Sequence, residues 1–271
     1  MGGNVINRSS ATVSARDRTI RVRRSSGLLR ALAPLVLLTA WLITSFSGLL
    51  PERVLPSPLT ITRAGIEEYR HGDLIDALLV SGQRVFVGFS LGAAIAVILG
   101  IVAATSTFCE YAIDPPMQML RTLPLFGLIP LFIVWFGVDE QPKIFLIALG
   151  AAFPLYLNIY AGIKQIDSKL LEVADALNLT RWERLRHIVF PGALPQALVG
   201  MRQALGFAWL SLIVAEQVNA SAGLGFIVNN AREFLRTDIV IFGLLVYGIF
   251  GLLTDSIVRA LERHTLRWSR P

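Results

Sequence analysis

The chain has 271 residues, of which 54% are hydrophobic and only 16% are charged. Soluble domains carry about 25% charged residues, so this composition favours a protein of the lipid bilayer. The formal net charge of +6 lies in tails and loops around apolar runs, without interleaved aromatic residues, and this placement argues against nucleic-acid binding.

Cysteine and histidine give no support for metal or redox chemistry. The one cysteine, Cys109, excludes an intrachain disulfide and any multi-cysteine metal site. The three histidines, His71, His187 and His264, lie far apart in the sequence with no ligand-like spacing. We therefore expect no metal site.

The N-terminus predicts a basic cytoplasmic tail (1–30) followed by a first transmembrane helix (31–51). The tail carries seven arginines against one acid, Asp17, and the residues after it are uncharged as far as Pro51. The stretch RVRRSSGLL loosely resembles a twin-arginine export signal, but no small-residue cleavage pattern follows it. A signal-anchor helix is therefore favoured over a cleaved leader.

An external loop is expected at 52–84. The stretch PERVLPSPLTI should be extended because of its three prolines, whereas 63–84 alternates apolar and charged positions as an interfacial helix does. This helix would lead the chain into the next span, and a receptor contact stays open.

Five further runs have the length and apolarity expected of membrane-spanning helices, which need about 20 residues. They are 85–109, 115–138 with several prolines, 144–163, 197–215 and 239–254. Together with 31–51 they predict an all-α polytopic membrane protein with six transmembrane helices. Small residues recur every four positions in the second span (Gly88, Gly92, Ala96 and Gly100), which predicts close packing against another helix, within the chain or across a dimer.

The orientation follows from arginine and lysine, which concentrate on the cytoplasmic side. The tails and the 164–187 segment together hold sixteen of these residues, against seven in the alternate loops, where acids match them. Both termini and the 164–187 segment are therefore expected in the cytoplasm, as an even number of spans requires.

The sequence carries no recognisable energy source of its own. None of its three lysines follows a glycine, as a phosphate-binding loop requires. The cleaner spans have no charged residue in their interiors, and Glu216 lies at the predicted outer end of its span, so ion coupling is also disfavoured. Three functions remain open: a channel, a structural subunit, or a transporter driven by another protein.

The polar segment 165–195 predicts two short helices that meet at a tight turn. Asp167 or Ser168 can cap the first, and Asn178 tolerates the left-handed conformation that ends a helix. Thr180 and Glu183 have the spacing of a capping box for the second, which Pro191 and Gly192 are expected to close. Such short helices need a surface to pack on, which is either the inner leaflet or a cytosolic partner.

This segment resembles a family motif. The pattern E-V-A-x-x-x-N-(x9)-I-V-F-P is similar to the EAA loop of permease subunits of binding-protein-dependent ABC importers. It departs from that loop at Val173, at Phe190 and at Asn178, which stands where the family has glycine. The resemblance implies that the loop couples the permease to an ATPase, through Glu172, Ala174, Asn178, Leu179, Ile188 and Pro191.

Further blocks at 124–158, 200–216 and 230–240 resemble the aliphatic sulfonate, taurine and nitrate permeases, and the resemblance covers about residues 50–268. It implies a type I ABC importer permease fold, with a MetI-like core of five helices plus one N-terminal helix. The core would occupy 85–260, with the coupling loop at 165–195 and a cytoplasmic tail at 261–271.

The resemblance also implies the partners. They are a second copy of the permease, a dimer of ATPase subunits, and a periplasmic or lipid-anchored solute-binding protein, with ATP and Mg bound by the ATPase. No cofactor and no catalytic residue are expected in this chain. The protein would lie in the cytoplasmic (inner) membrane.

A sulfonate is a small anion, so positive and polar groups within the spans are candidates for its pathway. They are Arg121, Asn158, Arg202, Gln203 and Ser211. Snorkelling to the headgroups explains the arginines equally well, and helix–helix hydrogen bonds explain the others. Taurine, nitrate or a pyrimidine precursor are alternative substrates; an ATP-independent channel or carrier and a non-transporting membrane scaffold are alternative functions.

Overall fold

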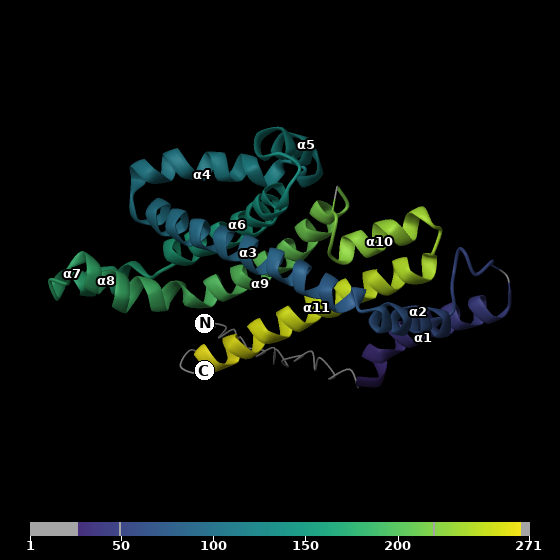
Figure 1. Cartoon of the computed structure of the whole chain (residues 1–271). Coiled ribbons are helices and arrows are strands. Elements are labelled where there is room, and N and C mark those ends of the chain that lie inside the picture. Colours follow the sequence, from purple (N-terminus) through teal and green to yellow (C-terminus); the bar gives the residue numbers. More distant parts are fainter. Residues whose placement is uncertain (1–26, 49, 219, 267–271) are drawn as a thin grey trace, which may run out of the picture. The chain divides into compact units, whose positions relative to one another are not determined.

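The computed structural model describes residues 27–48, 50–218 and 220–266. Every regular element in these ranges is a helix (Figure 1). The chain divides into two compact units, 1–49 and 50–271, which are described separately. Most of the predicted basic tail (1–30) and the end of the C-terminal tail lie outside the described residues.

In the described residues of the first unit the chain forms one helix, α1 (Gly27–Phe46). Its apolar part, Leu32–Phe46, is shorter than the other candidate spans. The helix ends at Phe46, earlier than the expected end of the first span at Pro51.

The second unit begins with α2 (Pro58–His71), which matches part of the expected interfacial helix. Ser57 caps it by accepting a hydrogen bond from the Thr60 amide, and Gly72, at φ 88°, ends it. The next helix, α3 (Asp73–Thr105), starts at once and runs for 33 residues. Residues 73–84, which the sequence placed in the external loop, therefore form the first turns of a long helix.

The small residues of α3 pack against α6 (Glu140–Lys164) of the same chain. A Cβ atom at Gly92 would lie 2.2 Å from the Ala148 carbonyl oxygen, so only glycine allows this approach. The opposite side of α6 contacts α9 (Phe190–Glu216), where a Cβ at Gly150 would meet the Ser211 hydroxyl at 2.0 Å. Helix α6 is thus the centre of the bundle, between α3 and α9.

The expected third span is divided into two helices. Helices α4 (Thr107–Thr122) and α5 (Leu125–Phe136) meet at an angle of 114°. Pro124 follows the bend and restricts Leu123 to the extended conformation that it adopts, ψ 133°. The two prolines inside α4 leave it helical, so the bend occurs later than they suggest.

The remaining elements are α7 (Ser168–Ala176), α8 (Arg181–Arg184), a π-helical turn (Leu185–Val189), α9, α10 (Leu224–Glu233) and α11 (Thr237–Thr265). Four stretches of the described chain are long and apolar enough to cross a membrane, or five if α4 and α5 count as one broken span. Large apolar side chains remain exposed along them, as expected for helices that face lipid.

Candidate functional site

The polar segment of the sequence forms a helical hairpin (residues 167–189) at the end of the second unit opposite to α10 (Figure 1). Asp167 caps α7, as expected, because its carboxylate accepts a hydrogen bond from the Lys169 amide at 2.9 Å. Helix α7 has nine residues, fewer than a helix needs to be stable alone, so its packing against neighbours holds it.

The turn of the hairpin confirms the left-handed conformation expected at Asn178, which has φ 51°. The amide of Leu179 donates to the Ala174 carbonyl and the amide of Asn178 donates to the Asp175 carbonyl, each at 3.0 Å. These two bonds define a Schellman motif, whose left-handed position is usually glycine and sometimes asparagine. Asn178 therefore provides the turn that glycine provides in the family motif.

The second arm begins with the expected capping box. The hydroxyl of Thr180 accepts from the Glu183 amide, and the Glu183 carboxylate accepts from the Thr180 amide. Arg184 forms an ion pair with Asp175 of the first arm, so the two arms are joined beyond the turn.

The expected end of this arm at Pro191 and Gly192 is wrong. The helix continues through the π-helical turn into α9, and the amide of Phe190 bonds to the Leu185 carbonyl five residues back. Pro191 has no amide to donate to the His187 carbonyl, and its ring crowds that carbonyl. A wider turn at this position relieves the crowding, and the hairpin becomes continuous with a membrane-spanning helix.

The hairpin has an exposed apolar surface and a buried one. Leu170, Val173, Leu177 and Trp182 are each more than half exposed, whereas Ala174 and Val189 are buried. Of the residues expected to couple, Glu172 and Asn178 are exposed, Ala174 is fully buried, and Leu179, Ile188 and Pro191 are half-buried. All six lie on the hairpin or in the first turn of α9.

Among the expected pathway residues, Asn158 and Gln203 lie together. The Asn158 side-chain amide donates to the Gln203 carbonyl oxygen at 2.9 Å, and Gln196 donates to Asn158 at 2.8 Å. This amide cluster joins α6 to α9, and Gln203 is exposed at its edge. Sequence inspection missed Gln196, which lies seven residues before Gln203 on the same face of the helix.

The other three pathway candidates lie apart from this cluster. Arg202 forms ion pairs with Asp255 and Glu262 of α11, so acids of the same chain neutralise its charge. Arg121 is exposed in the last turn of α4, beside the bend. Ser211 is fully buried between α9 and α6.

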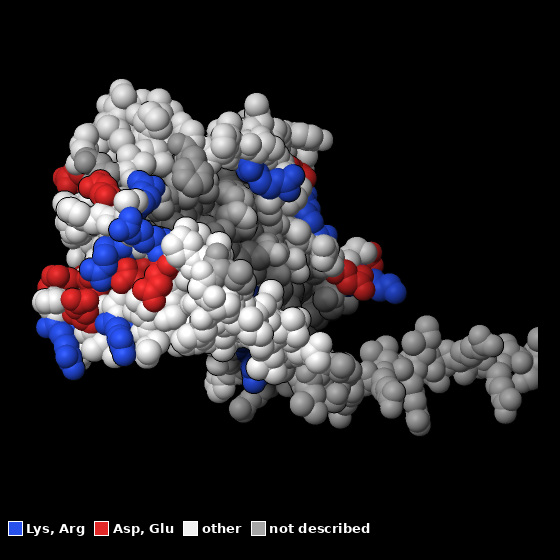
Figure 2. All heavy atoms as spheres, turned by 90° about the vertical axis from the view of Figure 1, so that its right-hand side faces the viewer, with Lys and Arg blue, Asp and Glu red and all other residues white. Residues whose placement is uncertain are grey.

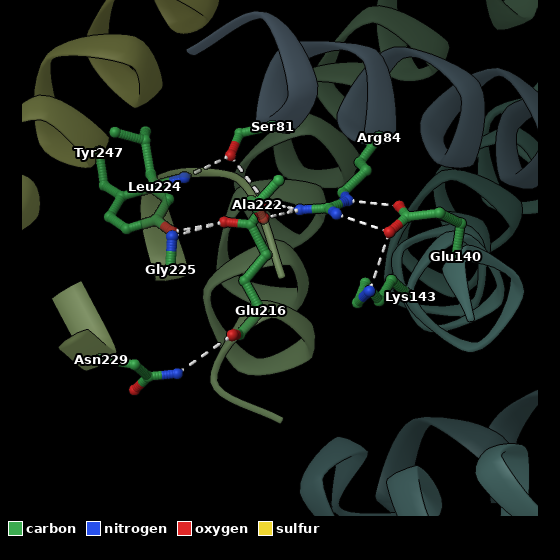
Figure 3. Close-up of polar contacts among 10 residues, drawn as sticks. All are labelled: Ser81, Arg84, Glu140, Lys143, Glu216, Ala222, Leu224, Gly225, Asn229 and Tyr247. Carbon is green, nitrogen blue, oxygen red and sulfur yellow. Dashed lines mark hydrogen bonds and ion pairs between the residues drawn. The ribbon is translucent and has the colours of Figure 1, made fainter. Parts of the chain in front are cut away.

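The structure also shows a buried polar network that sequence inspection missed. It consists of Ser81, Arg84, Glu140, Lys143, Glu216 and Tyr247 (Figure 3), which are buried except for Glu140, whose side chain is 44% exposed. Glu216 is the last residue of α9, at the end of that helix away from the hairpin. Arg84 lies at the centre of the network. One edge of its guanidinium donates two hydrogen bonds of 2.6 Å to Glu140, and its Nη1 donates to Glu216, also at 2.6 Å, and to the Ala222 carbonyl.

Glu216 is fully buried at the end of α9, and all its carboxylate partners are donors. They are the Ser81 and Tyr247 hydroxyls, each at 2.7 Å, the Gly225 amide at 2.9 Å, and Arg84. The Leu224 amide in turn donates to Ser81. The network thus joins α3, the start of α6 and the end of α9 to the N-terminus of α10 and to α11, and its two acids balance its two bases.

Each charged residue of this network lies at the predicted outer edge of a span. At that position, exposure of the side chain to water is the simpler explanation for a charge. The only signal in the sequence is that charges of opposite sign occur at equal depth in neighbouring spans. A hydropathy pattern shows the depth of a residue but not the direction of its side chain, so the pairing could not be inferred.

Acidic and basic side chains intermingle on the face of the bundle near α10, as Figure 2 shows. A hollow of about 430 Å³ opens there, lined by Glu68, Asp73, Asp76, Ala77, Ala222, Gly223 and Arg236 among others. Burial and the neighbouring Asp73 raise the pKa of the Glu68 carboxyl above its usual range. Within the described ranges, no three or more histidine, cysteine, aspartate or glutamate side chains form a group that could hold a metal ion.

Comparison with known proteins shows which families and proteins this chain is similar to. Residues 96–267 match the family model described as the binding-protein-dependent transport system inner membrane component. A Bacillus subtilis (strain 168) protein named as an aliphatic sulfonates transport permease is 43% identical over 237 residues, which cover 88% of this chain and 86% of that relative.

Two further similarities agree with this match. The taurine transport system permease protein of Escherichia coli (strain K12) is 33% identical, over 86% of each chain. The crystal structure of an amino acid ABC transporter superposes with a TM-score of 0.62 at 18% identity, covering 74% of this chain and 97% of that one, which shows a common fold.

Proposed function

Because the chain belongs to the family of binding-protein-dependent transport system inner membrane components, we propose that it carries aliphatic sulfonates, or a related small anion, across the membrane. It is the permease component of an ABC importer, and ATP hydrolysis belongs to a separate ATPase partner. The similarity to the aliphatic sulfonates permease, over most of both chains, is the observation that carries the choice of substrate.

The proposed assembly is a homodimer of this chain with two ATPase subunits, which bind the ATP and Mg, and a solute-binding protein on the outside. We infer six spans in each copy, with α1 as the first and the α4–α5 pair as one broken span. Both termini and the hairpin then lie in the cytoplasm, where the excess of arginine and lysine supports them.

The hairpin is proposed as the coupling element. Its exposed side chains Leu170, Val173, Leu177 and Trp182 form an apolar surface that a groove of the ATPase can cover. Glu172 lies on the same arm, is exposed, and forms no ion pair with another described residue, so its carboxylate is free for a partner. Asn178 and Ala174 hold the turn that presents this surface.

For the anion pathway, the amide cluster has the strongest support. Amide groups can donate hydrogen bonds to sulfonate oxygens without fixing a permanent charge in the membrane. Gln203 is exposed at mid-helix, and at Gly206, one turn further, a Cβ atom would meet nothing within 4 Å. Weaker candidates for the pathway are Arg121, Arg202 and Ser211. Arg202 is already paired with acids, and Ser211 is enclosed.

Reconstitution tests this function. The chain is purified with its ATPase and solute-binding protein, placed in proteoliposomes, and supplied with radiolabelled ethanesulfonate. We expect ATP-dependent uptake that unlabelled ethanesulfonate suppresses more strongly than taurine or nitrate does. Uptake by the chain without the ATPase would instead establish a channel or carrier, and the absence of solute flux with all partners present would leave a membrane scaffold.

A second experiment tests the coupling residues. Glu172→Ala, and deletion of residues 174–178, should each abolish most ATP-driven uptake while the protein remains in the membrane. Glu233→Ala, at an exposed glutamate near the end of α10, is the matched control and should transport normally. If the Glu172 variant and the deletion both behave like this control, the hairpin does not couple.

A further inference from the structure

Helix α9 connects the two polar regions of this molecule directly. It continues from the hairpin through the π-helical turn and ends 27 residues later at Glu216, inside the buried polar network. At 1.5 Å per residue the helix is about 40 Å long, so it crosses the whole bundle. A displacement of the hairpin therefore reaches Glu216 through one continuous element, without passing from helix to helix.

We propose that Glu216 is a positioning residue of the transport cycle, and that the buried polar network is a latch at the outer ends of the helices. When the hairpin moves, α9 withdraws Glu216 from its donors, which releases α10 and α11 from α3 and opens the outer side. This inference rests on the proposed coupling role of the hairpin, and it does not depend on which anion is carried.

The partners of Glu216 favour a latch over a static joint. Its donors come from α3, α10 and α11, so this one carboxylate links all three helices. The other hydrogen bonds from α3 to the start of α10 are the single bonds that join Ser81 to the Leu224 amide and Arg84 to the Ala222 carbonyl. Each contact is a single directional bond of 2.6–2.9 Å, which a shift of about 1 Å weakens strongly. The contact of α6 with α9 is different, because interlocked small residues such as Gly150 and Gly200 hold it without ion pairs.

The hollow beside the network lowers the free-energy cost of opening the network. Ala222 and Gly223 line the hollow of about 430 Å³, and the Ala222 carbonyl accepts from Arg84. Separated charges are costly in a dry interior, whereas water in an adjacent hollow can solvate them as they part. Ala77, one turn before Ser81 on α3, is buried in the network region and also lines this hollow.

The test uses two tyrosines with the same chemistry. Tyr247→Phe removes one hydroxyl that donates to Glu216, and Tyr156→Phe removes one that donates to Asp114 between α6 and α4. Both rings are buried, and each substitution deletes one tyrosine–carboxylate bond, which is buried at Tyr247 and part-buried at Tyr156. The complex of permease and ATPase is assayed in nanodiscs for ATP hydrolysis without the solute-binding protein.

We expect Tyr247→Phe to raise this receptor-independent hydrolysis about fivefold, the factor that the loss of one hydrogen bond of ordinary strength gives. Glu216→Gln should raise it further, and Tyr156→Phe should leave it at the wild-type rate. If Tyr247→Phe and Tyr156→Phe hydrolyse ATP at equal rates in complexes of equal yield, the network is structural only.

A direct measurement of opening complements the hydrolysis assay. In a Cys109→Ser background, Ala77→Cys places the only thiol beside the hollow, and Ala151→Cys places it at a fully buried position of α6 as a control. With ATP and vanadate, an external membrane-impermeant maleimide should label the thiol at 77 at least about tenfold faster than in the resting complex, whereas the thiol at 151 stays unlabelled. An unchanged rate at 77 would overturn the latch.

The two proposals fail in different ways. If the hairpin does not couple, the wild-type chain does not change the hydrolysis rate of the ATPase. If only the latch is wrong, the wild-type complex behaves normally and the Tyr247 variant matches its control.

Discussion

The two ends of α9 use the same types of side chain in opposite surroundings. At the hairpin, glutamate, aspartate and arginine are largely exposed, and backbone caps and one ion pair fix the structure. At the buried polar network, Arg84 and Glu216 are 4% and 0% exposed. The hairpin can therefore meet a partner, whereas Arg84 and Glu216 can act only within the chain.

This difference in burial also sets how much each ion pair contributes. An exposed pair such as Arg184 with Asp175 contributes about 0–1 kcal/mol, because water solvates both charges when they separate. Removing one member of a buried pair leaves an uncompensated charge in the interior and costs about 3–5 kcal/mol. The network end should thus be much more sensitive to substitution than the hairpin end.

Glu216→Ala should have the largest effect on stability. It removes the acceptor of the Tyr247 hydroxyl and of the Gly225 amide in a buried region, and it leaves the Arg84 Nη1 with the Ala222 carbonyl alone, at a cost of about 3–5 kcal/mol. Thermal unfolding of the detergent-purified chain measures the loss. Asp175→Ala at the hairpin is the control and should cost less than about 1 kcal/mol; equal effects would remove the contrast between the two ends.

The hairpin could be predicted from the sequence because its determinants are local. The capping box needs Thr180 and Glu183 three positions apart, and the turn needs only a residue that tolerates a positive φ. Glu216 and Arg84, by contrast, are 132 positions apart and meet only when α3 and α9 pack in the same bundle. The spacing of apolar residues in either helix does not predict the contact between Glu216 and Arg84.

The helices themselves were predictable as apolar runs, but their breaks were not. A hydropathy pattern does not show the 114° bend after α4, because the chain stays apolar through it. Pro191 was also expected to end a helix, whereas a π-helical turn accommodates the proline and the helix continues. In both cases tertiary packing decides between a kink and a stop.

Ala174→Leu should have the next largest effect, and it tests whether the hairpin has a sensitive position of its own. Ala174 is fully buried, so the extra methyl groups have no room and should cost about 1–3 kcal/mol. We expect the arms to separate and ATP-driven uptake to fall strongly, whereas Ala176→Leu, at an exposed position of the same helix, should have little effect. Normal uptake by the Ala174 variant would show that the buried side of the hairpin is unimportant for coupling.

Asn178 should be sensitive through its backbone rather than through its contacts. Asn178→Gly keeps the left-handed turn and should be nearly silent, whereas Asn178→Val forces a β-branched residue to φ 51° at a cost of about 1–2 kcal/mol. The measurement is the number of ATP molecules hydrolysed per solute transported, which should rise for the valine variant alone. If valine is tolerated, the turn does not set the position of the coupling surface.

The smallest expected effect lies at the network end, where the same type of turn is built on a less suitable residue. Leu235 follows α10 at φ 56°, and the Arg236 amide donates to the Ala231 carbonyl as in the hairpin turn. Leu235→Gly should relieve strain of about 1–2 kcal/mol but lose backbone entropy of about 0.5–1 kcal/mol, for a net gain near 1 kcal/mol in thermal unfolding. Leu235→Ala separates the contribution of the backbone strain from that of the leucine side chain, because it keeps the strain and removes only an exposed side chain. A gain with alanine as large as with glycine would mean that the exposed leucine, rather than its backbone, lowers the stability of this turn.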